Sequence, residues 1–104
     1  MSDISKVITN YDVMAYLGID YADDMVNINI ARAINTADGE LRESVGDDYP
    51  VDHPLTKELA LMYAANAYDN RGLVALTGNE FKAAEGIALK LRLVLRRGSN
   101  EQTI

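Results

Sequence analysis

The sequence predicts an all-α protein: a small single-domain bundle of about four helices, with a short first helix and a buried central third helix. Two observations favour this class. The composition is that of an ordinary globular protein, yet it holds only two prolines, seven aromatic residues and no tryptophan, which disfavours a β-sandwich. Apolar residues also recur at helical spacings of three and four. The 104 residues suffice for one domain, so we treat 1–104 as a single helical domain.

The first helix is predicted to begin after Thr9, in the stretch TNYD. Thr9 can cap the helix while Asp12, three residues later, returns a hydrogen bond to the backbone as a variant capping box. Apolar residues follow, and Gly18 is a typical left-handed terminator, so the helix has about two turns. Residues 1–8 are predicted to form an N-terminal arm.

A longer second helix is predicted after the acidic pair Asp23 and Asp24, which suit an N-cap and a first-turn acid. Gly46 is expected to end it. Gly39 interrupts its apolar stripe, and we interpret this glycine as a close-packing point in preference to a kink. The stripe follows spacings of four and three and consists of Val26, Ile30, Ile34, Ala37, Leu41 and Val45.

The third helix is predicted from Pro54, which suits a first helical position, with Asp52 or His53 near the cap. Apolar residues occupy nearly every face of the helix, which indicates that it is the central and most buried one. It runs towards a polar end whose residue types also occur in active sites. With no nucleophile or base beside them, we interpret these residues as a helix terminus: Asp69, Asn70, Arg71 and Gly72.

A fourth helix is predicted from Glu80 to Arg97, with Asn79 as its N-cap. Residues 89–96, LKLRLVLR, alternate like a strand, but Leu, Lys and Arg are good helix formers and no β-branched partner strand is evident. We therefore prefer a helix here. Residues 98–104 are predicted to form a mobile tail.

The sequence favours no catalytic, cofactor or metal site, and we expect the protein not to be an enzyme. The chain has no cysteine, and its one histidine, His53, is accompanied by no recognisable nucleophile motif. The pairs Asp23/Asp24 and Asp47/Asp48 lack the ligand spacing of an EF-hand, and no phosphate-binding glycine motif occurs. With no signal peptide or membrane-spanning run evident, we expect a soluble protein.

Charge is distributed unevenly along the chain. Residues 1–54 carry eleven acidic and three basic side chains, whereas residues 55–104 carry five acidic and seven basic ones. This polarity suits a subunit whose acidic part meets the basic part of a neighbour, although solvated surface charge would produce the same pattern. The residues that we predict to form such an interface are Asp23, Asp24, Lys90, Arg92, Arg96 and Arg97.

The order of these features resembles the short head–tail connector proteins of long-tailed bacteriophages. ITNYDVMAYLGIDYADDMVNINIARAINTADGEL is similar to the opening of that family, with its capped first helix, acidic turn and long second helix. DHPLTKELALMYAANAYDNRG is similar to its proline-opened apolar helix, and IALKLRLVLR stands where the family has a closing leucine and arginine segment. The resemblance covers about residues 7 to 97, nearly the whole chain.

The resemblance implies a structural virion protein without catalytic residues. Its subunits would form a ring of about a dozen copies between the portal protein and the tail-side head-completion or tail-terminator protein. DNA would pass through the ring without sequence-specific binding, at the head–tail junction of a virion assembled in the bacterial cytoplasm. No membrane is implied, and the basic residues of the fourth helix would contact a neighbouring subunit or the portal. The residues also allow a different class, a small helical adaptor or regulatory module, in monomeric or dimeric form, whose fourth helix docks a partner.

Overall fold

A computed structural model describes residues 3–21, 23–69 and 78–102, with the side chains of the last helix described from 82 to 96. Within these ranges all regular structure is helical, which confirms the predicted all-α class. The elements are a 3-10 turn, η1 (Ile4–Lys6), followed by α1 (Asn10–Leu17), α2 (Asp24–Ser44), α3 (Pro54–Asp69) and α4 (Gly78–Gln102).

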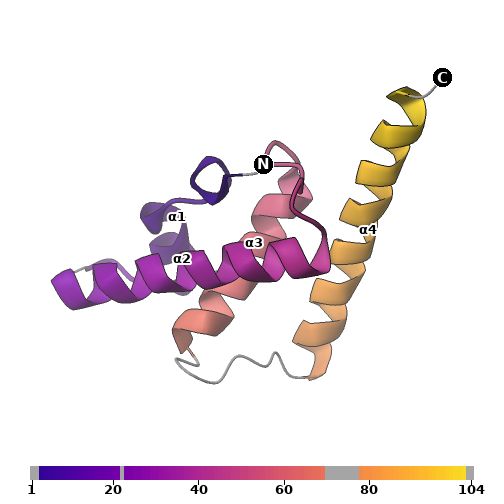
Figure 1. Ribbon diagram of the computed structural model, residues 1–104. Helices are drawn as coiled ribbons and strands as arrows, with labels where there is room; N and C mark the ends of the chain where they lie inside the picture. Colours follow the sequence, from indigo (N-terminus) through magenta and orange to yellow (C-terminus); the bar gives the residue numbers. More distant parts are fainter. Residues whose placement is uncertain (1–2, 22, 70–77, 103–104) are drawn as a thin grey trace.

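The helix α3 is the centre of the bundle, as its apolar composition predicts. It packs most extensively against α2 and also contacts α1 and α4. In Figure 1, α2 and α3 cross in the middle, α1 lies beside them, and α4 stands on the far side next to the end of α2. The Cα atoms extend over 51 × 28 × 19 Å, so the molecule is elongated.

Both predicted caps of α1 are present. The Thr9 hydroxyl accepts a hydrogen bond from the Asp12 N–H at 3.2 Å, and the Asp12 carboxylate accepts one from the Thr9 N–H at 2.9 Å. Gly18 follows the helix with φ 75°, a left-handed conformation that favours glycine. The ends of this helix are therefore set by local contacts.

The helix α2 also begins as predicted, because the Asp23 carboxylate accepts the Val26 N–H at 2.9 Å. It ends at Ser44, and Gly46 lies just beyond with φ 139°. The interpretation of Gly39 as a close-packing point is wrong: a Cβ placed there would meet no atom within 4 Å. Gly39 is exposed because it lies on the face opposite the buried stripe, and the helix continues through it.

One hydrophobic core joins all the elements. It includes Val7 and Ile8, so the described part of the predicted N-terminal arm, residues 3–8, is packed onto the bundle instead of extending from it. The Thr56 hydroxyl is also fully buried, without a hydrogen-bond partner in the described structure. The largest fully buried apolar side chains are Tyr49, Ile8, Ile30, Leu41, Leu59, Leu91 and Val13.

Residues 89–96 are helical, so the preference for a helix over a strand is confirmed. The boundaries of α4 differ from the prediction. The helix begins at Gly78, which places Asn79 inside it, and it continues past Arg97 and Gly98 to Gln102. Each added residue of a helix gains a backbone hydrogen bond once a nucleus exists, so one glycine without a proline does not end it. The mobility of residues 98–104 stays a prediction.

Candidate interaction surfaces

The acidic residues Asp23 and Asp24 lie at the exposed start of α2. Exposed large apolar side chains accompany them: Tyr21 is 71% exposed, Met25 64% and Ile28 48%. Monomeric proteins expose single apolar side chains routinely, but a cluster rimmed by polar groups is typical of interaction sites. We call this area the α2-tip surface and define it as Asp20, Tyr21, Asp23, Asp24, Met25 and Ile28.

The alternating leucines of residues 89–96 are divided between two faces of α4. In a helix, residues four apart share a face, whereas residues two apart are about 200° apart around the axis. Leu91 is fully buried and Leu95 is half-buried against the core. Leu89 and Leu93 point the other way and are 53% and 41% exposed. The pattern that resembled a strand therefore gives α4 a second apolar face.

Predicted basic residues flank this outward pair. Lys90, Arg92 and Arg96 are all exposed, and the helical period places Lys90 on one side of the leucines and the two arginines on the other. The side chain of Arg97, the fourth predicted cation, lies outside the described residues. We call this area the α4 outer surface and define it as Leu89, Lys90, Arg92, Leu93 and Arg96.

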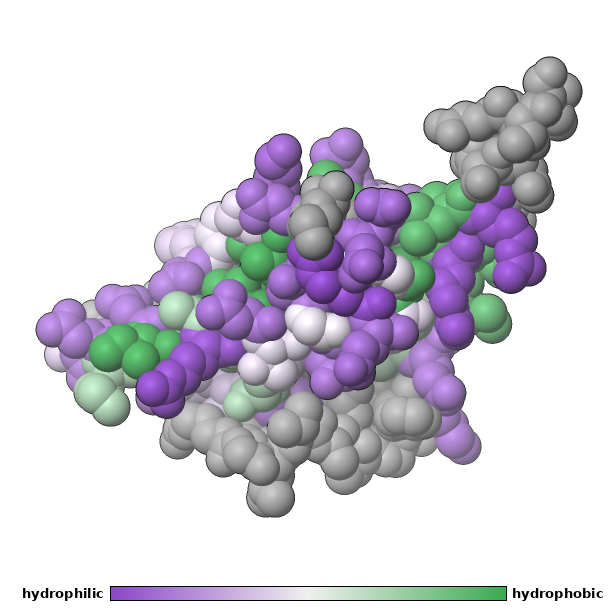
Figure 2. Space-filling view, in the orientation of Figure 1, coloured by the Kyte–Doolittle hydropathy of each residue, from purple (hydrophilic) through white to green (hydrophobic). Residues whose placement is uncertain are grey.

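The two surfaces lie at opposite ends of the molecule. In Figure 1, α2 begins at the left tip, and α4 rises at the right beside the other end of α2. Figure 2 shows green apolar side chains between purple polar ones at the left tip, and green side chains next to purple ones along α4. The structure thus separates the predicted acidic and basic interface residues, so they cannot contact one another within one subunit.

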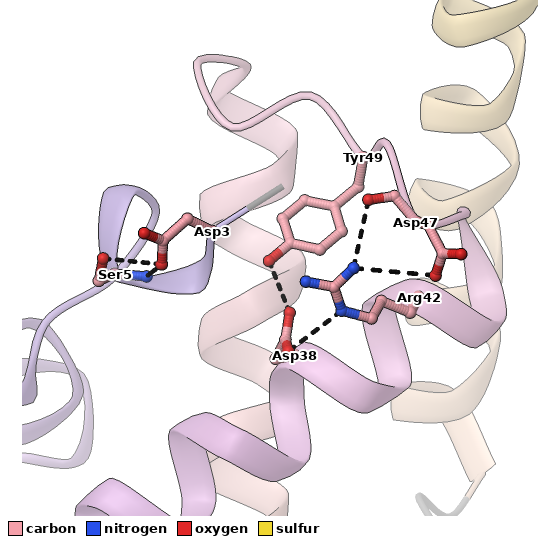
Figure 3. Close-up of polar contacts among 6 residues, drawn as sticks. All are labelled: Asp3, Ser5, Asp38, Arg42, Asp47 and Tyr49. Atoms are coloured by element: carbon pink, nitrogen blue, oxygen red, sulfur yellow. Dashed lines mark hydrogen bonds and ion pairs between the residues drawn. The ribbon is translucent and has the colours of Figure 1, made fainter. Parts of the chain in front are cut away.

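A polar cluster around Tyr49 was not predicted from the sequence (Figure 3). The Tyr49 hydroxyl donates to Asp38 Oδ1 at 2.8 Å, and Arg42 Nε donates to Asp38 Oδ2 at 3.1 Å. Arg42 Nη1 also donates to the Asp47 carbonyl at 3.4 Å, and its Cζ lies 5.7 Å from the centre of the Tyr49 ring. These contacts fasten the connection between α2 and α3 to the side of α2.

We call Asp38, Arg42, Asp47 and Tyr49 the Tyr49 clasp, because their contacts hold the α2–α3 connection against α2. Burial is the largest cause that raises the pKa of Tyr49 far above its ordinary value, and the hydrogen bond that its hydroxyl donates to Asp38 is the second. The hydrogen bond to Asp38 raises the pKa of the Arg42 guanidinium further. Nearby, Asp3 Oδ1 accepts from the Ser5 N–H at 3.0 Å and the Ser5 hydroxyl at 2.8 Å, and the side-chain bond lowers the pKa of Asp3 most. No nucleophile-and-base pair results from these contacts.

The other predicted positions lie at the two ends of α3. His53, one of two residues expected near its cap, accepts the Leu55 N–H on Nδ1 at 3.1 Å. Asp69 is the last residue of α3 and is exposed. The remaining members of the predicted terminus, Asn70, Arg71 and Gly72, lie outside the described residues.

Comparisons with known proteins identify no relative: no family model, curated protein or solved structure matches the chain. Across residues 3–21, 23–69 and 78–102, no three histidine, cysteine, aspartate or glutamate side chains are grouped so as to hold a metal ion. None of the helices in these ranges is long and apolar enough to cross a membrane. The described structure thus offers two candidate interaction surfaces, the α2-tip surface and the α4 outer surface.

Proposed function

We propose that the chain is a structural subunit of a bacteriophage head–tail connector, which assembles into a ring of about a dozen copies. The observation that carries the proposal is the placement of two partly apolar surfaces with opposite rims, acidic and basic, at opposite ends of one small helical domain. A subunit with two different surfaces binds its neighbours head to tail, and such contacts close into a ring when the rotation allows.

In this proposal the ring lies at the head–tail junction, between the portal protein and the tail-side head-completion or tail-terminator protein. The ring would be assembled in the bacterial cytoplasm and would extend the channel for DNA. The formal charge of −6 supports passage without tight binding, because affinity for a nucleic acid depends on cations that neutralise phosphates. No sequence-specific contact with the DNA is proposed.

Purified virions and a nonsense mutation in the gene test this function. We expect mass spectrometry to find the chain in virions, and the nonsense mutant to accumulate DNA-filled heads and unattached tails under the electron microscope. Supplying the wild-type chain from a plasmid should restore joined particles. Supplying a chain with Arg92→Glu and Arg96→Glu should restore fewer. Normal, infectious particles from the nonsense mutant would contradict the proposal.

A second function is supported by one observation, the outward leucine pair on α4, which is 53% and 41% exposed at Leu89 and Leu93. An amphipathic helix with a free apolar face is a typical docking element of small adaptor or regulatory modules. Such a module would form a closed dimer or bind a different protein. Light scattering on the purified chain separates the two functions, because a dimer that does not grow with concentration favours the adaptor.

A further inference from the structure

We propose that the α4 outer surface of one copy docks on the α2-tip surface of a second copy, with Leu89 and Leu93 packed against Met25 and Ile28. This inference deepens the proposed function, on which it rests for its biological meaning, since it names the contact that would close the ring. The occupant of each surface is then another copy of this chain.

The apolar parts of the two surfaces match as two helix faces do. Leu89 and Leu93 are four residues apart on α4, and Met25 and Ile28 are three residues apart on α2. Rows of side chains spaced by three and by four are those that interdigitate when two helices pack. All four side chains are at least 41% exposed in the single chain, so the contact would bury surface that the fold leaves in water.

The charged rims argue for this pairing over a symmetric one. Lys90, Arg92 and Arg96 border the leucines, whereas Asp23 and Asp24 stand at the start of α2 just before Met25, and the exposed Asp20 precedes them in the chain. A contact between two α4 outer surfaces would place cations together, and a contact between two α2 tips would place carboxylates together. Opposite charges across an interface select the partner and its orientation, and like charges reject the alternatives.

One cation limits the acidic region of the α2 tip. Arg32 is exposed and lies one turn beyond Ile28 on the same side of α2. The acidic rim is therefore confined to the beginning of the helix, and the docked α4 should direct its arginines towards Asp20 and Asp24. Exposed ion pairs contribute little individually, so the leucines are expected to supply the affinity and the charges the orientation.

The kind of assembly that this contact produces depends on where the two surfaces lie on the subunit. Because they lie at opposite ends of the elongated subunit, a docked pair still has one free surface of each kind. A third copy can then bind in the same way, and the series ends only when a ring closes. A symmetric dimer would leave no such free ends.

The absence of cysteine makes a cross-linking test specific. Two variants, Met25→Cys and Leu93→Cys, are prepared with tags of different mass, mixed at about 0.5 mM to favour a weak contact, and oxidised. A disulfide needs Cα atoms within about 7 Å, so it reports direct apposition. We expect the mixed 25–93 product to exceed the 25–25 and 93–93 products by about fivefold or more, against a statistical excess of about twofold for random collision.

A matched control replaces Leu93→Cys with Asp52→Cys, which adds an exposed thiol outside both surfaces. The 25–52 product should remain at the level of random collision. Predominant 25–25 or 93–93 products would show a symmetric contact and overturn the proposal. A 25–93 yield no higher than the 25–52 yield would overturn it as well.

A charge exchange tests the rims independently of the leucines. Adding Arg92→Glu and Arg96→Glu to the Leu93→Cys chain should lower the 25–93 product to about the level of random collision, and adding Asp20→Lys and Asp24→Lys to the Met25→Cys chain should restore it. Circular dichroism of each variant checks that the helices persist. Failure of the restoring pair in folded variants would contradict the assigned orientation.

The outcomes separate this inference from the connector function. Virions that contain the chain, together with a negative cross-link, would remove the proposed contact and leave the connector proposal standing. A positive cross-link in a chain that is absent from virions would do the reverse.

Discussion

The α1–α3 body, which consists of α1, α2 and α3, differs from α4 in how much of its apolar surface is buried. The body encloses most of the core, and hydrogen-bonding side chains cap the starts of α1 and α2. In contrast, α4 has 25 residues, and between residues 82 and 96 its fully buried side chains are Ala84, Ala88 and Leu91. The body therefore holds most of the buried apolar side chains, while α4 keeps one apolar face exposed.

Truncating one leucine in each region should give the largest difference in stability between the body and α4. Leu59 is fully buried in α3, so Leu59→Ala should lower the free energy of unfolding by about 2–5 kcal/mol through lost burial and a cavity. Leu93→Ala on the outer face of α4 should change it by no more than about 0.5 kcal/mol. Urea unfolding of dilute protein measures both. Equal losses in the free energy of unfolding would show that the outward-facing Leu93 stabilises the fold as much as the buried Leu59 does.

The clasp around Tyr49 should give the next largest effect. Tyr49→Phe removes the hydroxyl that donates to Asp38, and we expect a loss of about 1–2 kcal/mol near neutral pH, since Asp38 keeps its bond to Arg42. Leu89→Ala on α4 is the control and should have no comparable effect.

The same tyrosine predicts a dependence of stability on pH. Because the pKa of Tyr49 is raised in the folded state, its contribution is fully present below the ordinary value of 10.0 and is lost as the pH rises above it. Burial likewise raises the pKa of Tyr63, whose hydroxyl lies 3.1 Å from Ser44 Oγ, so Tyr49→Phe should reduce the alkaline loss without abolishing it. Urea midpoints between pH 8 and about 11 provide the measurement. Identical slopes for variant and wild type would refute the clasp.

Loss of a cap should have a smaller effect on the body. Thr9→Ala removes the hydroxyl that accepts the Asp12 N–H, and we expect thermal unfolding to show a loss of about 1 kcal/mol. Thr9→Ser preserves the acceptor and should remain close to wild type. If both variants lose the same stability, packing of the threonine methyl, and not capping, is responsible.

The smallest expected effects are gains. Gly39 in α2 and Gly86 in α4 are exposed helical residues where a Cβ would meet no atom within 4 Å. Each glycine-to-alanine change should therefore stabilise its helix by up to about 1 kcal/mol through backbone entropy. In denaturant unfolding, Gly39→Ala should raise the global free energy of unfolding. If α4 opens locally before the body unfolds, Gly86→Ala should slow hydrogen exchange in α4 by more than its effect on the global free energy of unfolding accounts for.

Local signals in the sequence predicted the parts of the fold that depend on neighbouring residues. The caps at Thr9 and Asp23 each satisfy a backbone N–H three residues away, so their residue types and spacing reveal them. Gly39 lies two residues from both Ala37 and Leu41, so the helical period already places it on the opposite face from the apolar stripe, and the close-packing interpretation overlooked this spacing. The end of α4 was missed for a different reason, as Gly98 permits a helix to stop without requiring it.

The candidate surfaces were predicted in part. Charge counts identified the acidic and basic residues, but the outward pair Leu89 and Leu93 emerged only when the alternating segment proved to be helical. The hydrogen bond from Tyr49 to Asp38 spans eleven positions and depends on how the α2–α3 connection folds back. The i, i+4 spacing of Asp38 and Arg42 was a visible signal of one half of that cluster, whereas the tyrosine had none.

Hydrogen exchange of the wild-type chain over a concentration series tests most directly whether α4 is covered by another copy. We predict that amides of residues 86–96 and of residues 23–30 gain protection together as concentration rises, while amides of α3 stay unchanged. Protection that is independent of concentration in both segments, or that rises in only one of them, would contradict a head-to-tail contact between these two surfaces.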